Sequence, residues 1–283
     1  MELTNLNHIK TLLSRHGFHF SKRMGQNFLI ADWVPRDIAH ACGAGAGDGV
    51  VEVGPGIGSL TIALAQRAEQ VVAVELDRTL LPILQETLAP YPNTEVVSGD
   101  VMELDLAALA AEKLAGLRPF VCANLPYNIT TPVLTKFLEA GCFESITVMI
   151  QREVARRICA RPATPDYGAF SLFCQYHAHC ELLFDVPPDC FLPAPKVTSS
   201  VIRLVPRHMP PVEAPPDILF PLIRAAFAQR RKTLLNGLRA AYACRSREAL
   251  CGLLGECGLP DTVRGEQLSL EQFSLLALRL TKI

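Results

Sequence analysis

An amide and an aromatic ring lie close together in the segment Asn124-Leu125-Pro126-Tyr127. The side chain of Asn124 supplies a carbonyl oxygen that can accept a hydrogen bond from an amino group. A turn fixed by Pro126 leaves the Leu125 carbonyl as a second acceptor, and Tyr127 offers a flat face on which a base can stack. An isolated Asn-x-Pro-Tyr is often an ordinary turn, so its neighbours decide the interpretation. Together these groups could hold the amino group of a planar ring.

A glycine-rich segment, Glu52-Val53-Gly54-Pro55-Gly56-Ile57-Gly58, follows a β-branched run and precedes a helical pattern. Glycines at such a strand-to-helix turn let the backbone bend tightly and approach a ligand closely. Glu75 ends the next β-branched run, where a carboxylate can accept hydrogen bonds from the two hydroxyls of a ribose. Asp100 ends the third run and could accept from an adenine amino group, while Val101 packs on the ring. These residues predict a site for a ligand that contains a nucleoside.

The glycine turn and Glu75 alone also describe a dinucleotide site, in which an acid follows the turn by about 20 residues. That alternative is an NAD-type oxidoreductase, and it leaves Asn124 and Tyr127 unexplained. Glu52 favours a different ligand, since a carboxylate is poorly placed beside a pyrophosphate but well placed beside a cationic amino acid moiety. The cofactor that raises the melting temperature would separate the two interpretations.

Strands and helices must bring these segments together. Helical patterns, such as residues 59–67 and 78–88, alternate with β-branched runs, which predicts a mostly parallel sheet with helices on both faces. The carboxyl ends of its strands then share one edge, where ligands bind in such α/β folds. A Pro-rich loop too short for a crossover helix separates the last two runs, so that pair is expected to be antiparallel. The seven runs are residues 49–53, 70–75, 94–98, 120–123, 145–150, 181–186 and 199–205.

The chain is expected to form two domains. Five prolines fall within residues 206–216, which excludes a regular helix or a central strand there. We interpret that stretch as a linker between a catalytic domain at residues 1–205 and a small all-helical domain at residues 217–283. The catalytic domain begins with an N-terminal arm at residues 1–35. Helices are expected in the second domain at residues 218–228, 230–243, 247–257 and 270–282.

The composition is that of a globular protein, because 49% of the 283 residues are hydrophobic and 19% are charged. The 10 cysteines are scattered, and no pair has the Cys-x-x-Cys spacing of a structural zinc site. The first ten residues lack the pattern of a secretion signal, and no apolar run approaches the length of a membrane span. These features predict a cytoplasmic protein with reduced thiols, no metal and no membrane association.

Positive charge is concentrated toward the end of the chain. Residues 201–283 contain 12 Lys and Arg against 7 Asp and Glu, whereas residues 1–200 contain 15 against 21. Residues 218–247 include basic side chains and no acidic one, which predicts a surface that binds the phosphates of a nucleic acid. The basic residues are Arg224, Arg230, Arg231, Lys232, Arg239, Arg245 and Arg247, and Lys22 and Arg23 in the N-terminal arm could extend this surface.

Taken in order, the motifs resemble those of the ribosomal RNA adenine N6-dimethyltransferase family, and within it those of the bacterial small-subunit (16S) enzymes. The resemblance runs from residue 25 to about 237. Each motif alone is unspecific, whereas the ordered set is highly specific, and no motif position departs from the pattern. The matching segments are Gly25-Gln26-Asn27-Phe28-Leu29, Glu52 to Gly58, Val74-Glu75-Leu76-Asp77, Gly99-Asp100, Asn124 to Ile129, Gln151-Arg152-Glu153-Val154-Ala155, Pro187-Pro188, Phe191, Pro193, Pro195-Lys196-Val197, Ser199, and Phe227 to Leu234.

The resemblance implies a Rossmann-like class I methyltransferase that transfers methyl groups from S-adenosyl-L-methionine to adenine N6 in 16S ribosomal RNA. Two adjacent adenines would be dimethylated during assembly of the small ribosomal subunit. The target adenine would be held by the catalytic residues Asn124, Leu125 and Tyr127, with Phe191 stacked on its other face. Gln26 would help to close the cofactor pocket. The residues expected in that pocket are Gln26, Asn27, Leu29, Gly54, Gly56, Glu75, Leu76, Asp100, Val101 and Asn124.

Two alternatives to this function remain. One is a large-subunit ribosomal RNA adenine methylase of the antibiotic-resistance type, against which residues 229–233 favour the small-subunit enzyme. The other is a non-catalytic ribosome-assembly or transcription factor with the same fold, against which the intact segment 124–127 speaks. Methyl transfer to an amino group needs no general base, so His177 and His179 are interpreted as structural or surface residues. A monomer is expected.

Overall fold

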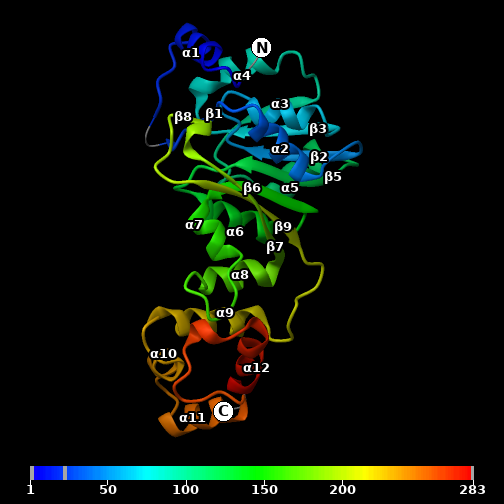
Figure 1. Cartoon of the computed structure of the whole chain (residues 1–283). Coiled ribbons are helices and arrows are strands. Elements are labelled where there is room, and N and C mark those ends of the chain that lie inside the picture. Colours follow the sequence, from blue (N-terminus) through cyan, green and yellow to red (C-terminus); the bar gives the residue numbers. More distant parts are fainter. Residues whose placement is uncertain (1–2, 22–23, 282–283) are drawn as a thin grey trace. The chain divides into compact units, whose positions relative to one another are not determined.

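The computed structural model describes residues 3–21 and 24–281 (Figure 1). The chain forms two compact units, one of residues 1–155 with 180–206 and one of residues 156–179 with 207–283. The first unit is built on a seven-stranded sheet with the strand order β4-β3-β2-β5-β6-β9-β7, and it also holds a two-stranded sheet, β1-β8. The second unit is built from helices. The predicted α/β fold followed by a helical region is confirmed.

Five parallel strands form most of the large sheet. The Val-rich sequences of β2 and β3 suit strands that are covered on both faces, and β2 is buried along its whole length. β9 (Ser199–Pro206) runs antiparallel to β6, and β7 (Ala178–Val186) lies beside β9 at the edge. The sheet is therefore mostly parallel, as predicted. The parallel strands are β2 (Asp48–Val53), β3 (Gln70–Glu75), β4 (Thr94–Ser98), β5 (Arg118–Asn124) and β6 (Ser145–Gln151).

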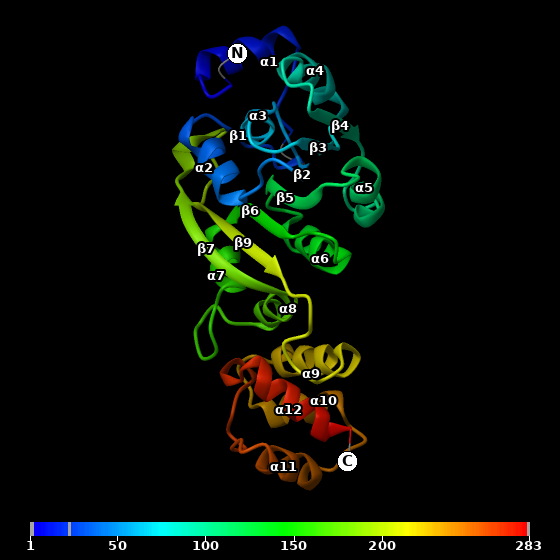
Figure 2. The same ribbon diagram turned by 90° about the vertical axis from the view of Figure 1, so that its right-hand side faces the viewer.

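Helices cover both faces of this sheet. Figure 2 shows α2 on one face and α5 and α6 on the other. On the α2 side, Ile38 and Leu64 of the helices pack with Val50, Val71 and Met149 of the strands in one apolar core. The helices that begin in the first unit are α1 (Leu6–Arg15), α2 (Trp33–Cys42), α3 (Ser59–Ala65), α4 (Leu81–Leu88, after a 3-10 turn at Arg78–Leu80), α5 (Leu106–Lys113), α6 (Thr130–Ala140) and α7 (Arg152–Ile158).

The N-terminal arm is more ordered than its sequence suggested. Residues 1–35 were expected only as an arm, but they contain α1, and the side chain of Asn5 caps the first turn of that helix. Ile9 and Leu12 of α1 pack with Ile83 and Leu84 of α4. Further on, β1 (Phe28–Leu29) pairs antiparallel with β8 (Phe191–Leu192). The arm is thus fixed to the sheet domain at both points.

The second unit has an apolar core of its own, to which Leu222, Leu253, Phe273 and Leu276 contribute. Ser246 and Ser269 cap two of its helices with their side chains, which satisfies free backbone N–H groups. None of the helices in the described part of the chain has the length and apolar character of a membrane span. The helices of this unit are α8 (Ala169–His177), α9 (Pro216–Ala228), α10 (Leu234–Ala241), α11 (Arg247–Glu256) and α12 (Leu270–Leu280).

Several boundaries in this unit differ from the predicted ones. Residues 156–179 group with the C-terminal helices rather than with the sheet. α9 starts at Pro216, because proline fits the first turn of a helix, where its missing N–H has no intrahelical partner. The helix expected at residues 230–243 is only α10, since residues 230–233 form a turn. The assignment of functions to the two units remains a prediction.

Candidate functional site

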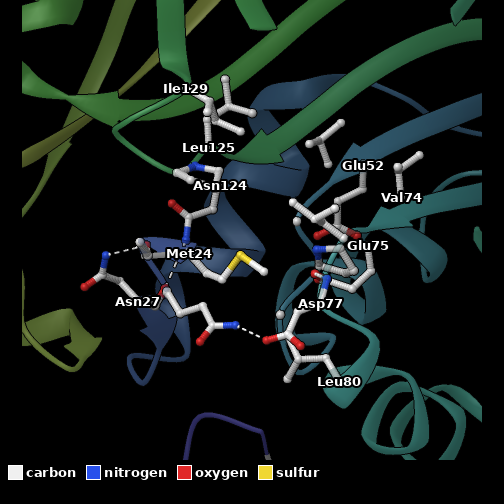
Figure 3. Close-up of a pocket in the computed structure, with 18 of the residues that line it drawn as sticks. Met24, Asn27, Glu52, Val74, Glu75, Asp77, Leu80, Asn124, Leu125 and Ile129 are labelled. Atoms are coloured by element: carbon white, nitrogen blue, oxygen red, sulfur yellow. Dashed lines mark hydrogen bonds between the residues drawn. The ribbon is translucent and has the colours of Figure 1, made fainter. Parts of the chain in front are cut away.

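A cavity of about 740 Å³ opens where β2, β3, β4 and β5 end (Figure 3). Five segments that are distant in the sequence line it, and they are residues 24–29, 52–57, 74–77, 99–101 and 124–129. This is the edge at which parallel α/β sheets bind ligands. Every residue predicted to contact the cofactor lines the cavity: Gln26, Asn27, Leu29, Gly54, Gly56, Glu75, Leu76, Asp100, Val101 and Asn124.

The glycine turn needs its glycines. Gly54, Gly56 and Gly58 have φ angles of +70°, +60° and +93°, a region that side chains with a Cβ rarely adopt. A Cβ on Gly56 would lie only 3.0 Å from the ring of Phe28, and Phe28 follows the cavity residue Asn27. At Gly54 and Gly56 the cavity wall therefore consists of backbone without a side chain.

Four acidic residues line the cavity: Glu52, Glu75, Asp77 and Asp100. Glu52 is 1% exposed, and its Oε2 atom has no hydrogen-bond partner within the described ranges of the chain. Burial raises the pKa of Glu52 to about 8, and the charge of Glu75 adds to this shift. Burial likewise raises the pKa of Glu75 to about 7, although its Oε1 accepts from the backbone N–H of Asp77 at 2.7 Å. The Oδ1 of Asp100 accepts from the backbone N–H of Met102 at 2.8 Å. Without a ligand, burial therefore favours the neutral form of Glu52, and a cationic group bound beside Glu52 and Glu75 would favour their charged forms.

Gln26 ties the N-terminal arm to the end of β3. Its Nε2 donates to Oδ2 of Asp77 at 2.6 Å, and its Oε1 accepts from the backbone N–H of Ser21 at 3.0 Å. The dashed line at Asp77 in Figure 3 marks the first bond, and Met24 extends into the space between Asn124 and Glu75 in the same view. These bonds hold the arm across one side of the cavity, which fits the closing role predicted for Gln26.

Asn124, at the end of β5, is oriented by the arm. Its Nδ2 donates to the backbone carbonyl of Asn27 at 3.3 Å. Among the residues that the structure describes, Oδ1 of Asn124 has no hydrogen-bond donor, so this oxygen remains an available acceptor. The next residue, Leu125, donates its own N–H to the carbonyl of Met149 on β6 at 3.1 Å. One hydrogen bond therefore orients the Asn124 side chain, and a second one fixes the backbone at Leu125.

Tyr127 lines the cavity and is half-buried. Its hydroxyl forms a 2.7 Å hydrogen bond with Oγ of Ser199, at the start of β9. Burial raises the pKa of Tyr127, and the hydrogen bond from Ser199 acts in the opposite direction. The ring therefore stays a neutral phenol at neutral pH, with its position fixed at the hydroxyl end.

Phe191 differs from the other three predicted catalytic residues. It is 2% exposed and belongs to the apolar core between α2 and the sheet, and it is not among the residues that line the cavity. Its backbone pairs with Leu29, which does line the cavity. Stacking of Phe191 on a base would require its ring to leave this core, and that role stays a prediction.

The basic residues predicted at positions 224–247 to bind nucleic acid lie in the second unit. Arg224, Arg231, Lys232 and Arg239 are exposed on α9, on α10 and on the turn between them. Arg230 is only 47% exposed, because its guanidinium pairs with Glu266 at 2.9 Å and also donates to the carbonyl of Pro165. It is therefore partly engaged within the protein. Lys22 and Arg23, which were expected to add to this surface, lie outside the described residues.

Several residues of the site have no role in the predictions from the motifs. Asp77, which holds Gln26, stands inside a matched motif, but no role was predicted for it. Met24 and Asn128 line the cavity beside predicted residues, so proximity in the sequence could have indicated them. The Tyr127–Ser199 bond joins residues that are 72 positions apart, and no local pattern indicates it.

The fold and this cavity define a Rossmann-like class I methyltransferase, and comparison with known proteins narrows the class. The sequence profile of the family described as ribosomal RNA adenine dimethylase matches residues 17–281. The chain is 46% identical to the ribosomal RNA small subunit methyltransferase A of Alkaliphilus oremlandii over 275 residues, which cover 96% of each protein. It is 43% identical to the protein of that name from Bacillus thuringiensis over 281 residues, which cover 98% of this chain and 96% of the relative. The chain belongs to the ribosomal RNA adenine dimethylase family.

Solved structures agree with this fold. The crystal structure of the 23S rRNA methyltransferase ErmE has a TM-score of 0.69 and 28% identity, and the match covers 90% of this chain and 99% of that one. A dimethyladenosine transferase from Plasmodium falciparum has a TM-score of 0.75 at 22% identity, covering 90% and 97% of the two chains. Both comparisons extend over the sheet and the C-terminal helices.

Proposed function

We propose that this protein transfers methyl groups from S-adenosylmethionine to the N6 amino group of adenines in 16S ribosomal RNA. We further propose that it dimethylates two adjacent adenines during assembly of the small ribosomal subunit. One structural observation carries the proposal: a carboxamide with a free acceptor oxygen, Asn124, lies in the same cavity as the glycine turn and Glu75. The nearly full-length identity to relatives named ribosomal RNA small subunit methyltransferase A supports the choice of RNA.

The cavity residues fit a donor that combines a nucleoside with a cationic amino acid. Glu75 and Asp100 end successive strands, where carboxylates can accept from ribose hydroxyls and from an adenine amino group. The unpaired oxygen of Glu52 is a buried acceptor that a cationic group would satisfy. Gly54 and Gly56 leave room for the ligand along the backbone. S-adenosylmethionine supplies an electrophilic methyl group when bound in such a site.

Asn124 and the Leu125 carbonyl make the target nitrogen reactive. An adenine amino group is a poor nucleophile, because its lone pair is delocalised into the ring. Two fixed acceptors can draw the amino hydrogens out of the ring plane, which frees the lone pair and aligns it. The bonds from Asn124 to Asn27 and from Leu125 to Met149 hold those acceptors before the base arrives. Neither group acts as a general base, and the proton leaves to solvent after transfer.

The base has to leave its stack before it can reach these acceptors. Tyr127 provides one face of its binding slot, and we assign the other face to Phe191, once its ring has moved from the core. None of the residues that line the cavity is a histidine. His177 instead lies parallel to Phe220 in the second unit, at a ring distance of 6.0 Å, so we give it no part in the chemistry.

The second unit supplies basic side chains for binding ribosomal RNA. Arg224, Arg231, Lys232 and Arg239 are exposed, which leaves their charges available to phosphates. We propose that the protein works in the cytoplasm, where the ribosomal subunits are assembled, and that it works as a monomer.

The decisive experiment maps N6-methylated adenines on both ribosomal RNAs. Small subunits from cells that lack this protein are incubated with the purified enzyme and S-adenosylmethionine, and large subunits from the same cells are treated in parallel. Two adjacent dimethylated adenines in 16S RNA are expected. Methylation of 23S RNA alone would support the resistance-type activity instead, which the likeness to ErmE makes the relevant competitor. No methylation of either RNA would exclude both activities.

A further inference from the structure

Ser199 is the hydrogen-bond partner of Tyr127, and it is 0% exposed. Their oxygens are 2.7 Å apart, and either can be the donor. Tyr127 lines the cavity, whereas Ser199 is not among the residues that line it. A buried hydroxyl thus fixes the far end of a ring that the proposed reaction uses as a stacking face.

The sheet places this serine relative to Asn124. β6 lies between β5 and β9, and Asn124 pairs with Met149 on one side of it, while Ser199 pairs with Gln151 on the other. Met149 and Gln151 are two residues apart on the same strand. β6 therefore fixes the position of Ser199 relative to Asn124, because it pairs with both of their strands.

Neighbouring bonds make the position of Ser199 rigid. The carbonyl of Thr198 accepts from the N–H of Arg152 at 3.0 Å. The hydroxyl of Ser200 donates to Oδ1 of Asp185 at 2.5 Å, and Oδ2 of that carboxylate lies 3.6 Å from a guanidinium nitrogen of Arg152. Both residues that flank Ser199 are thus held, so its hydroxyl presents a fixed partner to Tyr127.

We propose that Ser199 is a positioning residue for methyl transfer, which acts by holding the Tyr127 ring at the angle required to stack on the target adenine. This inference rests on the proposed function and adds a residue to it. Ser199 touches neither donor nor base; its effect passes through the Tyr127 hydroxyl alone. Loss of that bond lets the ring rotate, so the base is bound in fewer productive orientations. The turnover number should therefore fall while the affinity for S-adenosylmethionine stays the same.

The test is a double-mutant cycle with Ser199→Ala and Tyr127→Phe, which remove the same bond from its two ends. Each single variant should lower kcat on small subunits by about tenfold, with an unchanged Kd for S-adenosylmethionine. The double variant should be no slower than either single variant. Ser199→Thr keeps a hydroxyl and should restore turnover. Ser145→Ala is the matched control, because Ser145 is a buried strand serine whose hydroxyl has no partner among the described residues.

Several outcomes would overturn the assignment. They are wild-type kcat in Ser199→Ala, losses that multiply in the double variant, and a fall in kcat for Ser145→Ala equal to that for Ser199→Ala. If Ser199→Ala does not fold, Ser199→Cys replaces it, since it keeps the shape but bonds weakly. Wild-type protein that methylates no RNA would refute the proposed function, whereas an active wild type with an unaffected Ser199→Ala would refute only this inference.

Discussion

Asn124 combines two hydrogen-bonding tasks in one side chain. Its amide nitrogen is bonded to Asn27, and its oxygen is left for the target amino group. Replacement by alanine removes the acceptor but leaves the glycine turn and Glu75 in place. We expect Asn124→Ala to lower methyl transfer by about 100-fold or more, as removal of one preorganised polar group commonly does. S-adenosylmethionine should still bind, though more weakly. A tritiated-methyl assay with a parallel binding measurement checks this, and unchanged turnover would remove Asn124 from the mechanism.

Glu52 makes the stability of the unliganded protein depend on pH. Its pKa is about 8 in the folded chain and near 4.5 when solvated, so the folded state binds more protons between these values. Stability is therefore lost as pH rises through this window. Between pH 6 and pH 8 the loss from Glu52 is about 2 kcal/mol.

Glu52→Gln keeps the shape of the side chain without its titration. At pH 8 the variant should unfold at a higher temperature than the wild type. This increase in melting temperature should exceed the increase at pH 6 by about 5 °C. Thermal unfolding of both proteins without donor at the two pH values checks this. An identical change with pH in the two proteins would show that Glu52 does not titrate in this range.

At the scale of elements, the turn from β2 to α3 depends on glycine for two separable reasons. Gly56 has a φ of +60°, and a Cβ there would also press on Phe28 at 3.0 Å. Gly116 has a φ of +80° with nothing within 4 Å of the corresponding Cβ, so it is the matched control. Both alanine variants should lose about 1 kcal/mol of unfolding free energy. Only Gly56→Ala should also weaken S-adenosylmethionine binding, by about tenfold, because it displaces the arm. Equal affinities in calorimetry would contradict this role of Gly56.

The central strands could be predicted because each is a short apolar run, and the first three of these runs end at or next to a glycine or an acid. The run at residues 70–75, for example, coincides with β3. Parallel pairing then brings the strand ends together, which is why Glu75, Asp100 and Asn124 were expected in one cavity and lie there. Local sequence was sufficient for these features because one rule of sheet topology connects them.

Features that depend on tertiary packing could not be predicted in this way. Arg230 looked like part of a helix, but its guanidinium is drawn to Glu266 and Pro165, and the chain turns there. The burial of Phe191 follows from its pairing with β1, a strand of two residues that leaves no periodic pattern. The bond between Tyr127 and Ser199 depends on the register of β6 with β9, which no local motif encodes.

At the scale of the whole molecule, acidic and basic residues are unevenly distributed along the chain. The chain carries a formal net charge of -1, yet its C-terminal 83 residues have an excess of basic groups. Affinity for a ribosomal subunit should therefore depend on the exposed basic residues of the second unit and not on the overall charge. Binding to the small subunit should weaken steeply with salt, because each phosphate contact releases counterions.

Arg231 and Lys232 provide the sharpest test of RNA binding by the second unit. Both are exposed and, unlike Arg230, neither has an ion pair within the described residues. In the double variant Arg231→Gln/Lys232→Gln, the plot of log binding constant against log salt concentration should become less steep, with a slope smaller in magnitude by about 2. Lys10→Gln/Arg36→Gln removes the same charge from exposed positions in the first unit and should leave the slope unchanged. Filter binding to small subunits over a salt series measures both. Equal slopes in the two double variants would show that bulk charge, and not the turn before α10, governs RNA binding.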